Sequence, residues 1–185
     1  MMCGQVSACG GDLTGTWTIT SGCLTSAGVK DAESGATGSC SGLTVAVTNI
    51  SVSGTVTFNA DMTYTFASLQ EQSTLTLNAP ASCVGSGSCS ALASALESTG
   101  DVASATCSGT SGCSCTAMQT PQTETESGTY SVSGSTVTTV PSTGTASSTP
   151  FCVQGSVLHL LDTSTMSMGA MGQATIDEDT IGIKQ

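Results

Sequence analysis

Residues 55–66, TVTFNADMTYTF, constrain the fold more than any other stretch of the sequence. Branched and aromatic side chains dominate this stretch, and they favour strands because they pack well on a pleated surface. Asn59-Ala60-Asp61 interrupts it with residues typical of turns. The apolar positions that alternate with polar ones are Val56, Phe58, Tyr64 and Phe66. The stretch therefore predicts a β-hairpin with one face to bury and one to leave in water.

Similar alternation recurs along the chain at the spacing of hairpins. The further strands are expected at residues 13–20, 43–47, 50–52, 75–77, 128–133, 136–140, 151–153, 157–161, 173–176 and 180–183. A phase shift near Thr48 and Asn49 predicts a bulge or tight turn. The acidic run Asp177-Glu178-Asp179 is expected to be a turn between the last two strands. This pattern predicts an all-β protein, an antiparallel meander barrel of about eight to ten strands.

Residues 80–120 differ from the rest of the chain, because serine, glycine and five cysteines crowd there. Leu92 and Leu96 are four residues apart, and Ser88 or Ser90 could cap a helix that ends at Gly100. We expect one short helix in a disulfide-bonded insert that lies over one end of the sheet. The predicted organisation is an N-terminal tether at residues 1–12 and a single barrel domain at residues 13–185, with the insert at 80–120.

The charge composition limits the classes of partner that the chain is expected to bind. Lys30 and Lys184 are the only basic side chains apart from His159, and thirteen acidic residues give a net charge of -11. Nucleic acid is excluded as a partner, because phosphate binding depends on Lys and Arg. An anionic membrane surface is disfavoured for the same reason. No stretch is long and apolar enough to predict a transmembrane span.

Ten cysteines indicate an oxidising environment, because disulfides persist outside the cytosol. We therefore expect an extracellular or outer-surface location. The cysteines expected in disulfides are Cys3, Cys23, Cys40, Cys83, Cys89, Cys107, Cys113, Cys115 and Cys152, with Cys9 as a further candidate. Five cysteines lie inside the insert and five outside it, so complete pairing within one chain requires at least one bond between the insert and the barrel.

The order of three segments resembles bacterial lipocalin-like domains of the calycin type. The segments are FNADMTYTF, GTYSVSGSTVTT and FCVQGSVLHLL, and Gly15-Thr16-Trp17 resembles the Gly-x-Trp that opens such barrels. The resemblance covers most of the chain outside residues 80–120, and it implies that Trp17 closes the bottom of the barrel. Met62 stands where the family usually has Gly, which implies a differently built turn. CGG, GTWTIT and the cysteine-rich insert together resemble secreted lipoproteins of myxobacteria and their relatives.

Cys9 has two interpretations. Val6-Ser7-Ala8-Cys9 resembles the lipobox of bacterial lipoproteins, in which the cysteine is acylated and becomes the first residue of the mature chain. The chain would then carry a lipid anchor, with Gly10-Gly11 as a flexible tether. In the other interpretation Cys9 is an ordinary disulfide cysteine. Acylation would leave nine cysteines, one of them free or bonded to another chain.

Three stretches are weak metal candidates. Zinc at Cys107, Cys113 and Cys115 is disfavoured, because their spacing does not match that of thiolate zinc sites. Met166, Met168 and Met171 could surround Cu(I), which favours sulfur, although Met side chains also fill gaps in a core. Asp177-Glu178-Asp179 could hold calcium, but a polar turn explains the same residues. We predict no metal and no cofactor.

The sequence also predicts no enzyme. His159 alternates with Leu158 and Leu160, so it is expected to face out as an exposed strand residue, with no orienting acid nearby. The leading hypothesis is a non-catalytic, exported lipocalin-like surface protein that binds a small apolar ligand or none. The alternative is a structural surface subunit that associates with copies of itself along strand edges. The expected inward side chains are Trp17, Val45, Val47, Phe58, Tyr64, Phe66, Val132 and Leu158.

Overall fold

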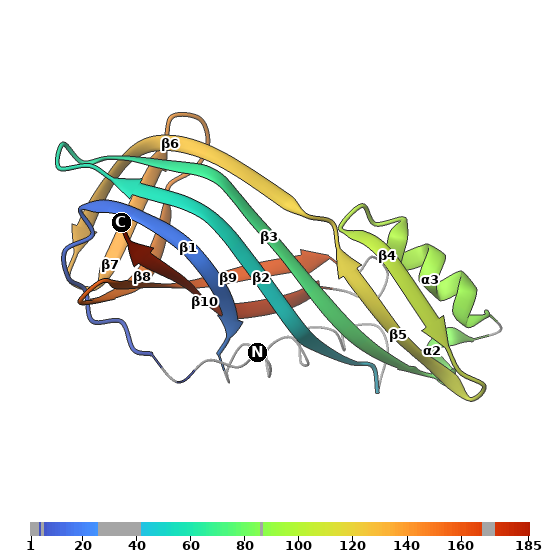
Figure 1. The fold of residues 1–185 in the computed structure, drawn as a ribbon. Coiled ribbons are helices and arrows are strands. Elements are labelled where there is room, and N and C mark those ends of the chain that lie inside the picture. Colours follow the sequence, from blue (N-terminus) through green and yellow to red (C-terminus); the bar gives the residue numbers. More distant parts are fainter. Residues whose placement is uncertain (1–3, 5, 26–41, 86, 168–172) are drawn as a thin grey trace.

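The computed structural model describes residues 4, 6–25, 42–85, 87–167 and 173–185, with only the backbone described for 164–167 and 173–176. Strands dominate these residues, and two short helices lie in the middle of the chain (Figure 1). The strands are β1 (Gly15–Leu24), β2 (Thr44–Phe58), β3 (Thr63–Pro80), β4 (Val102–Ser108), β5 (Gly112–Gln119), β6 (Gln122–Ser133), β7 (Thr136–Pro141), β8 (Ser147–Gln154), β9 (Val157–Ser167) and β10 (Gln173–Lys184). The helices are α2 (Ala81–Val84) and α3 (Cys89–Glu97).

Eight of the strands close into an antiparallel barrel. Their order is β1-β2-β3-β6-β7-β8-β9-β10, and β10 pairs with β1 to complete the ring. The barrel strands are neighbours in the order in which they occur along the chain. Between β3 and β6, which pair with each other, the chain forms α2, α3, β4 and β5. The predicted all-β meander barrel, with helical structure in the cysteine-rich region, is confirmed. A closed barrel also leaves no free strand edge along its wall.

The hairpin predicted at residues 55–66 is confirmed as the junction of β2 and β3. Phe58 pairs with Tyr64 across the turn, and Met62 N donates to Asn59 O at 3.1 Å. Met62 adopts the left-handed conformation, with φ of 65°. The turn therefore has the backbone conformation that glycine favours, although methionine occupies the position. The predicted bulge near Thr48 is also confirmed, because the β2–β3 register shifts between Val47 and Asn49.

Strand β3 belongs to two parts of the molecule. Its first half pairs with β6 inside the barrel, and its second half, from Thr74 to Pro80, pairs with β5. We call the second part the arm: residues 44–53 of β2, residues 72–80 of β3, and all of α2, α3, β4 and β5. The arm extends away from the barrel in Figure 1, with α3 packed on β4 and β5.

Two bulges bend β2 and β3 where the arm leaves the barrel. The β2–β3 register shifts between Ser53 and Thr55, and Ser68 opposite has φ of 51°. Gly54 lies between them, and a Cβ at Gly54 would lie 2.7 Å from Leu69 Cα. Only glycine permits this close backbone approach, which explains its place in the middle of a long strand.

The arm contains more strand than its sequence indicates. The predicted helix is confirmed as α3, whose start is capped by the Ser88 hydroxyl, an acceptor for Ala91 N at 3.2 Å. The hairpin β4–β5, by contrast, was not predicted. Serine, glycine and cysteine conceal its alternation, although Cys113, Cys115 and Ala117 all face the core from β5.

Three disulfides join described cysteines. Cys89–Cys113 and Cys107–Cys115 lie within the arm, and Cys9–Cys152 connects the N-terminal segment to β8. Cys23 and Cys83 are also disulfide-bonded. The other four cysteines of residues 80–120 pair among themselves, so the partner of Cys83 lies outside that region, as the odd count requires. Cys3 and Cys40 lie outside the described residues.

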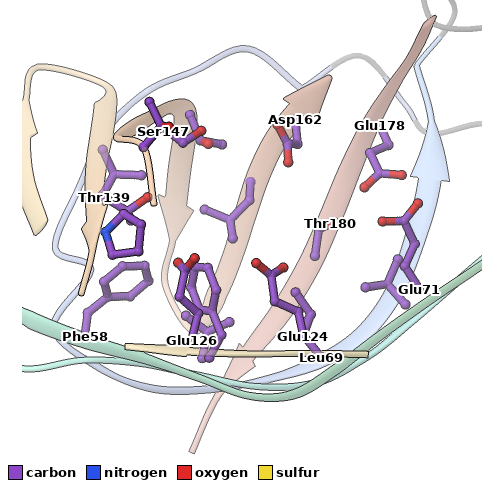
Figure 2. Close-up of a pocket in the computed structure, with 18 residues that line it drawn as sticks. Phe58, Leu69, Glu71, Glu124, Glu126, Thr139, Ser147, Asp162, Glu178 and Thr180 are labelled. Atoms are coloured by element: carbon purple, nitrogen blue, oxygen red, sulfur yellow. The ribbon is translucent and has the colours of Figure 1, made fainter. Parts of the chain in front are cut away.

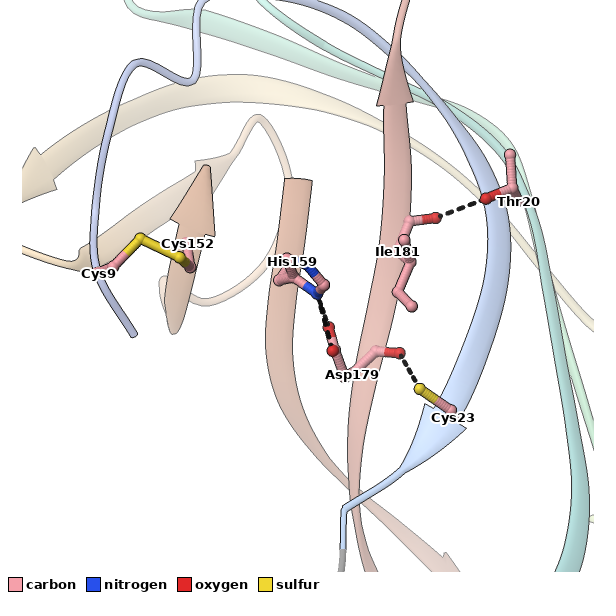
Figure 3. A network of polar contacts seen from close by, with 7 residues as sticks. All are labelled: Cys9, Thr20, Cys23, Cys152, His159, Asp179 and Ile181. Carbon is pink, nitrogen blue, oxygen red and sulfur yellow. Dashed lines mark hydrogen bonds and ion pairs between the residues drawn. A yellow bond between two sulfur atoms is a disulfide. The ribbon is translucent and has the colours of Figure 1, made fainter. Parts of the chain in front are cut away.

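Within the N-terminal segment, Cys9 and Gly10 lie against β8. Cys9 N and Gly10 N both donate to Phe151 O at 3.0 Å, and Val153 N donates to Gly10 O at 2.8 Å. The disulfide from Cys9 to Cys152 fixes the same contact (Figure 3). Of the two interpretations of Cys9, the structure has the disulfide, so its sulfur is not free to carry an acyl group.

Large side chains fill one end of the barrel. Trp17 is fully buried, and its Nε1 donates to Leu13 O at 2.8 Å. Phe58 packs edge-on against Tyr130, with ring centroids 5.0 Å apart. The expected inward residues are buried or half-buried with one exception. Val132 is 43% exposed, although it pairs with the buried Val137 on β7.

Candidate ligand cavity

A cavity of about 220 Å³ occupies the barrel interior beyond the aromatic end. Strands β2, β3, β6, β7, β8, β9 and β10 all contribute to its wall (Figure 2). Its lining residues are Val52, Val56, Phe58, Phe66, Leu69, Glu71, Glu124, Glu126, Val137, Thr139, Pro141, Thr145, Ser147, Thr149, Leu160, Asp162, Glu178 and Thr180. The cavity is thus built from the inward positions of the barrel strands.

The lining is strongly acidic. Five of the thirteen acidic residues of the chain contribute to it: Glu71, Glu124, Glu126, Asp162 and Glu178. They come from β3, β6, β9 and β10, so the closure of the barrel brings together residues that are far apart in the sequence. None of the described lining residues is basic. The carboxyl groups therefore face one another without an opposite charge from the wall.

Glu178 is the most deeply buried of these acids, with 4% of its surface exposed. Its carboxyl group faces that of Glu71 across the cavity in Figure 2. Burial raises the pKa of Glu178 to about 8, and the nearby carboxyls of Glu71 and Asp162 add to the effect. Its Oε2 has no hydrogen-bond partner among the described residues. Near neutral pH the empty cavity thus favours a protonated Glu178.

The other acids have different surroundings. Burial also raises the pKa of Glu71, with contributions from Asp162 and Glu124. Partial burial, together with Glu126 and Asp162, raises the pKa of Glu124. Glu126 has a partner within the wall, because the Tyr64 hydroxyl donates a hydrogen bond to its Oε1. Asp162 Oδ1 accepts from Thr163 N at 2.8 Å.

Away from Glu71 and Glu178, apolar side chains line the cavity and continue into the aromatic end, where Glu126 lies beside Phe58 in Figure 2. Phe58, Val56 and Val137 are buried, and Phe66 is half-buried against Tyr64, with ring centroids 4.9 Å apart. In Figure 2, Phe58 lies at the end of the cavity away from Glu71 and Glu178. The site thus combines a hydrocarbon surface with a cluster of carboxyl groups. Such a wall attracts a molecule that carries both an apolar body and a positive charge.

Asp177, Glu178 and Asp179 do not form the predicted turn. They lie in the middle of β10, which is one continuous strand. Because side chains alternate along a strand, Glu178 faces the cavity while its two neighbours face outward. The Thr163 hydroxyl donates to Asp177 Oδ1 at 2.6 Å, and Asp179 contacts His159. The three carboxyls therefore cannot share one calcium ion, and the calcium hypothesis is wrong for this run.

His159 is also different from its prediction. It faces outward as expected, but only 13% of its side chain is exposed. Its Nδ1 lies 2.8 Å from Oδ2 of Asp179, whose side chain is 1% exposed (Figure 3). The orienting acid comes from the neighbouring strand β10. This pair lies outside the barrel, away from the cavity, and neither residue lines it.

The cysteines considered for zinc and the methionines considered for Cu(I) differ in what the structure says about them. Cys107, Cys113 and Cys115 are all in disulfides, so they have no thiolates for zinc. Met168 and Met171 lie outside the described residues, and only the backbone of Met166 is described, within β9. Among the described residues, no group of three His, Cys, Asp or Glu side chains has an arrangement that could hold a metal ion.

The acids of the cavity were missed by sequence reasoning for identifiable reasons. Glu124 and Glu126 lie in QTETES, which has no apolar residue to indicate a strand. Their spacing does continue the inward phase of Tyr130, and that was the available signal. Glu71 lies in a similarly polar run, SLQEQS. The sequence indicated β3 and β6, but it did not indicate that these strands extend over the acidic residues.

Comparison with protein-family models, curated proteins and solved structures finds no match for this chain. The class of protein therefore follows from the architecture: a closed antiparallel barrel of eight strands, consistent with a calycin-like fold. The three disulfides are typical of an oxidising environment. Neither of the two helices in the described part of the chain has the length and apolar character to cross a bilayer.

Proposed function

We propose that this protein is an exported, non-catalytic barrel that binds a small molecule in its interior. The observation that carries the proposal is the cavity of about 220 Å³ between the aromatic end and the acidic side. A barrel of about eight strands can fill completely with side chains or hold one small ligand. Here the side chains leave room, and a few polar groups converge beside an apolar wall, as in small-molecule sites.

Binding explains the site better than catalysis does. The described part of the cavity lining has no histidine, cysteine or lysine, and the His159–Asp179 pair faces the other side of the wall. Buried carboxyls with raised pKa values can act as acids and bases in enzymes. In this cavity, however, five carboxyls without an opposite charge are a charge imbalance that a bound molecule would relieve. The three disulfides support an extracellular location for the bound and free forms alike.

A matched pair of variants on β7 tests the proposal. Val137 is buried and lines the cavity, whereas Val140 on the same strand is exposed. Val137→Phe should fill the cavity, and Val140→Phe should add the same bulk outside. A library of small molecules is screened by ligand-observed NMR against both variants and the parent protein. We expect compounds that bind the parent and Val140→Phe but not Val137→Phe. Equal binding by Val137→Phe would place the site elsewhere and contradict the proposal.

One observation favours a second function, assembly with copies of the same chain. In the described part of the chain, strand β4 is the terminal strand of the sheet and pairs only with β5. Its outer edge, where Ala105 N donates to Glu97 Oε1, could accept a strand from another copy. Thr106 is exposed on this edge strand, and Thr106→Lys would place a charge there. Analytical ultracentrifugation would show oligomers that this substitution dissociates if assembly is the function; a parent protein that is monomeric at all concentrations would exclude it.

A further inference from the structure

Glu178 is the group in the barrel whose interactions are incomplete. It is 4% exposed, it lines the cavity, and its Oε2 has no hydrogen-bond partner among the described residues. A buried carboxyl without a partner costs stability, because its desolvation is not offset. Such a group is rare in a folded protein and requires an explanation. A ligand that donates to this oxygen would supply one.

Among the described residues, none provides a cation for this position. Glu71 faces Glu178, and Asp162 and Glu124 lie on the adjacent wall, so every charged neighbour in the lining is an acid. Lys184 lies elsewhere, with its Nζ 5.2 Å from the centroid of the Trp17 ring. Within the described wall, Glu178 therefore has no cationic partner.

We propose that the cavity binds a small organic amine in its protonated form. Its ammonium group lies between Glu178 and Glu71, and its hydrocarbon body lies toward Phe58 and Phe66. An ammonium group has three donors and can satisfy both carboxyls at once. The aromatic rings offer a surface for the hydrocarbon. This inference rests on the proposed function, because it names the chemistry of the ligand in the same cavity.

The distribution of the acids favours an organic cation over a metal ion. Calcium needs six to eight oxygen ligands at about 2.3–2.6 Å around one point. The acids here are spread over four strands, and Glu126 is engaged by Tyr64. The described residues contain no group of three that could hold a metal. A cavity of about 220 Å³ is also smaller than the sites of drug-sized molecules, roughly 300–1,000 Å³. The expected ligand is therefore a small amine.

Binding should depend on pH in a defined direction. The charged groups that face Glu178 are Glu71 on β3, Glu124 and Glu126 on β6, and Asp162 on β9; its neighbour on β1 is Leu24. Because the pKa of Glu178 is raised to about 8 in the empty cavity, the group must lose a proton when an ammonium group binds. Affinity should rise with pH up to about 8, and binding should release protons.

The test uses phenethylamine, with phenethyl alcohol as the uncharged analogue and phenylpropionate as the anionic one. Isothermal titration of the full chain at about pH 8 should give binding for the amine only. Glu178→Gln should weaken it by about ten- to a hundred-fold, the loss expected for a charged hydrogen bond. Asp177→Asn removes the same charge one residue away, outside the cavity, and should change affinity less than about three-fold. Titrations in buffers of different ionisation enthalpy measure the released protons.

Each alternative outcome is decisive. Equal binding of the amine and the alcohol, unaffected by Glu178→Gln, would overturn the amine inference and leave the small-molecule function intact. Absence of amine binding in the parent would also overturn it, while the library screen with Val137→Phe decides the broader function separately. Calcium binding that Glu178→Gln abolishes would show that the site is a metal site. A thermal melt of Glu178→Gln confirms that the variant is folded before its affinity is compared.

Discussion

The barrel and the arm are stabilised in different ways. The barrel closes on itself, so every strand in its wall has two neighbours, and large aromatic side chains fill one end. The arm ends at β4, which has one neighbour, and small residues face its interior from β5. Two disulfides cross-link the arm. Where the hydrogen-bonded sheet does not close, covalent bonds contribute to the stabilisation.

The barrel and the arm also differ in the hydrogen bonding of their carboxyl groups. The barrel encloses a cavity lined by five carboxyl groups, and Oε2 of Glu178 has no hydrogen-bond partner among the described residues. In the arm, by contrast, Glu97 Oε1 accepts from Ala105 N at 2.9 Å. A buried polar atom without a partner is rare in a folded protein and is a candidate for a functional role. This difference supports the placement of the site in the barrel.

The largest expected effect separates the three disulfides that join described cysteines. Their sequence separations are 143 for Cys9–Cys152, 24 for Cys89–Cys113 and 8 for Cys107–Cys115. If restriction of the unfolded chain dominates, replacing each pair by serine should cost about 5, 3.5 and 2.5 kcal/mol respectively. Urea denaturation of the three double variants measures the order. The reverse order would mean that the arm depends on its short cross-links for native geometry, not only for unfolded-state entropy.

Much of this barrel could be predicted from sequence, but the site could not. The turn of the β2–β3 hairpin, the strand that contains Trp17 and the bulge at Thr48 follow from local alternation and turn chemistry. Glu178 looked like part of a turn, because nothing local shows that a polar residue lies in the middle of a long strand. The His159–Asp179 contact depends on the register of β9 against β10, which is set by the closure of the whole barrel. Cavities are properties of that closure and have no local signature.

Glu178→Gln should make the stability of the barrel less dependent on pH, because it removes a buried carboxyl group. Between pH 4.5 and about 8 the unfolded chain ionises this carboxyl while the folded chain keeps its proton. The folded state then binds more protons, so its stability falls as the pH rises through that window. The parent should lose about 3 kcal/mol between pH 5 and 8 relative to the variant. Denaturation curves across this range measure it, with Asp177→Asn as the control. Parallel curves for parent and Glu178→Gln would contradict the expectation.

Leu96→Ala tests whether the arm unfolds separately from the barrel. Leu96 is the only buried residue of α3 and belongs to the continuous core. Its truncation should cost about 3 kcal/mol. If the cost is local, hydrogen exchange will accelerate in α3, β4 and β5, while β7, β8 and β9 keep their protection. The half-buried Leu92 offers a control, because Leu92→Ala should have a smaller effect in the same segment. Uniform acceleration in all strands would show that arm and barrel form one cooperative unit.

The smallest effect concerns the turn at the closed end of the barrel. Met62 has φ of 65° and is 54% exposed, so its side chain contributes little packing to offset the conformation. A left-handed residue other than glycine costs about 1–2 kcal/mol, and the greater flexibility of glycine in the unfolded chain offsets part of that gain. Met62→Gly should therefore stabilise the protein by about 1 kcal/mol, whereas Met62→Ala, which keeps a Cβ, should leave stability nearly unchanged. Thermal melts compare the two. Ser68, the other such residue described, lies at the bulge where the arm begins. A gain at Met62 without one at Ser68→Gly would show that the hairpin turn stores strain that the junction with the arm does not.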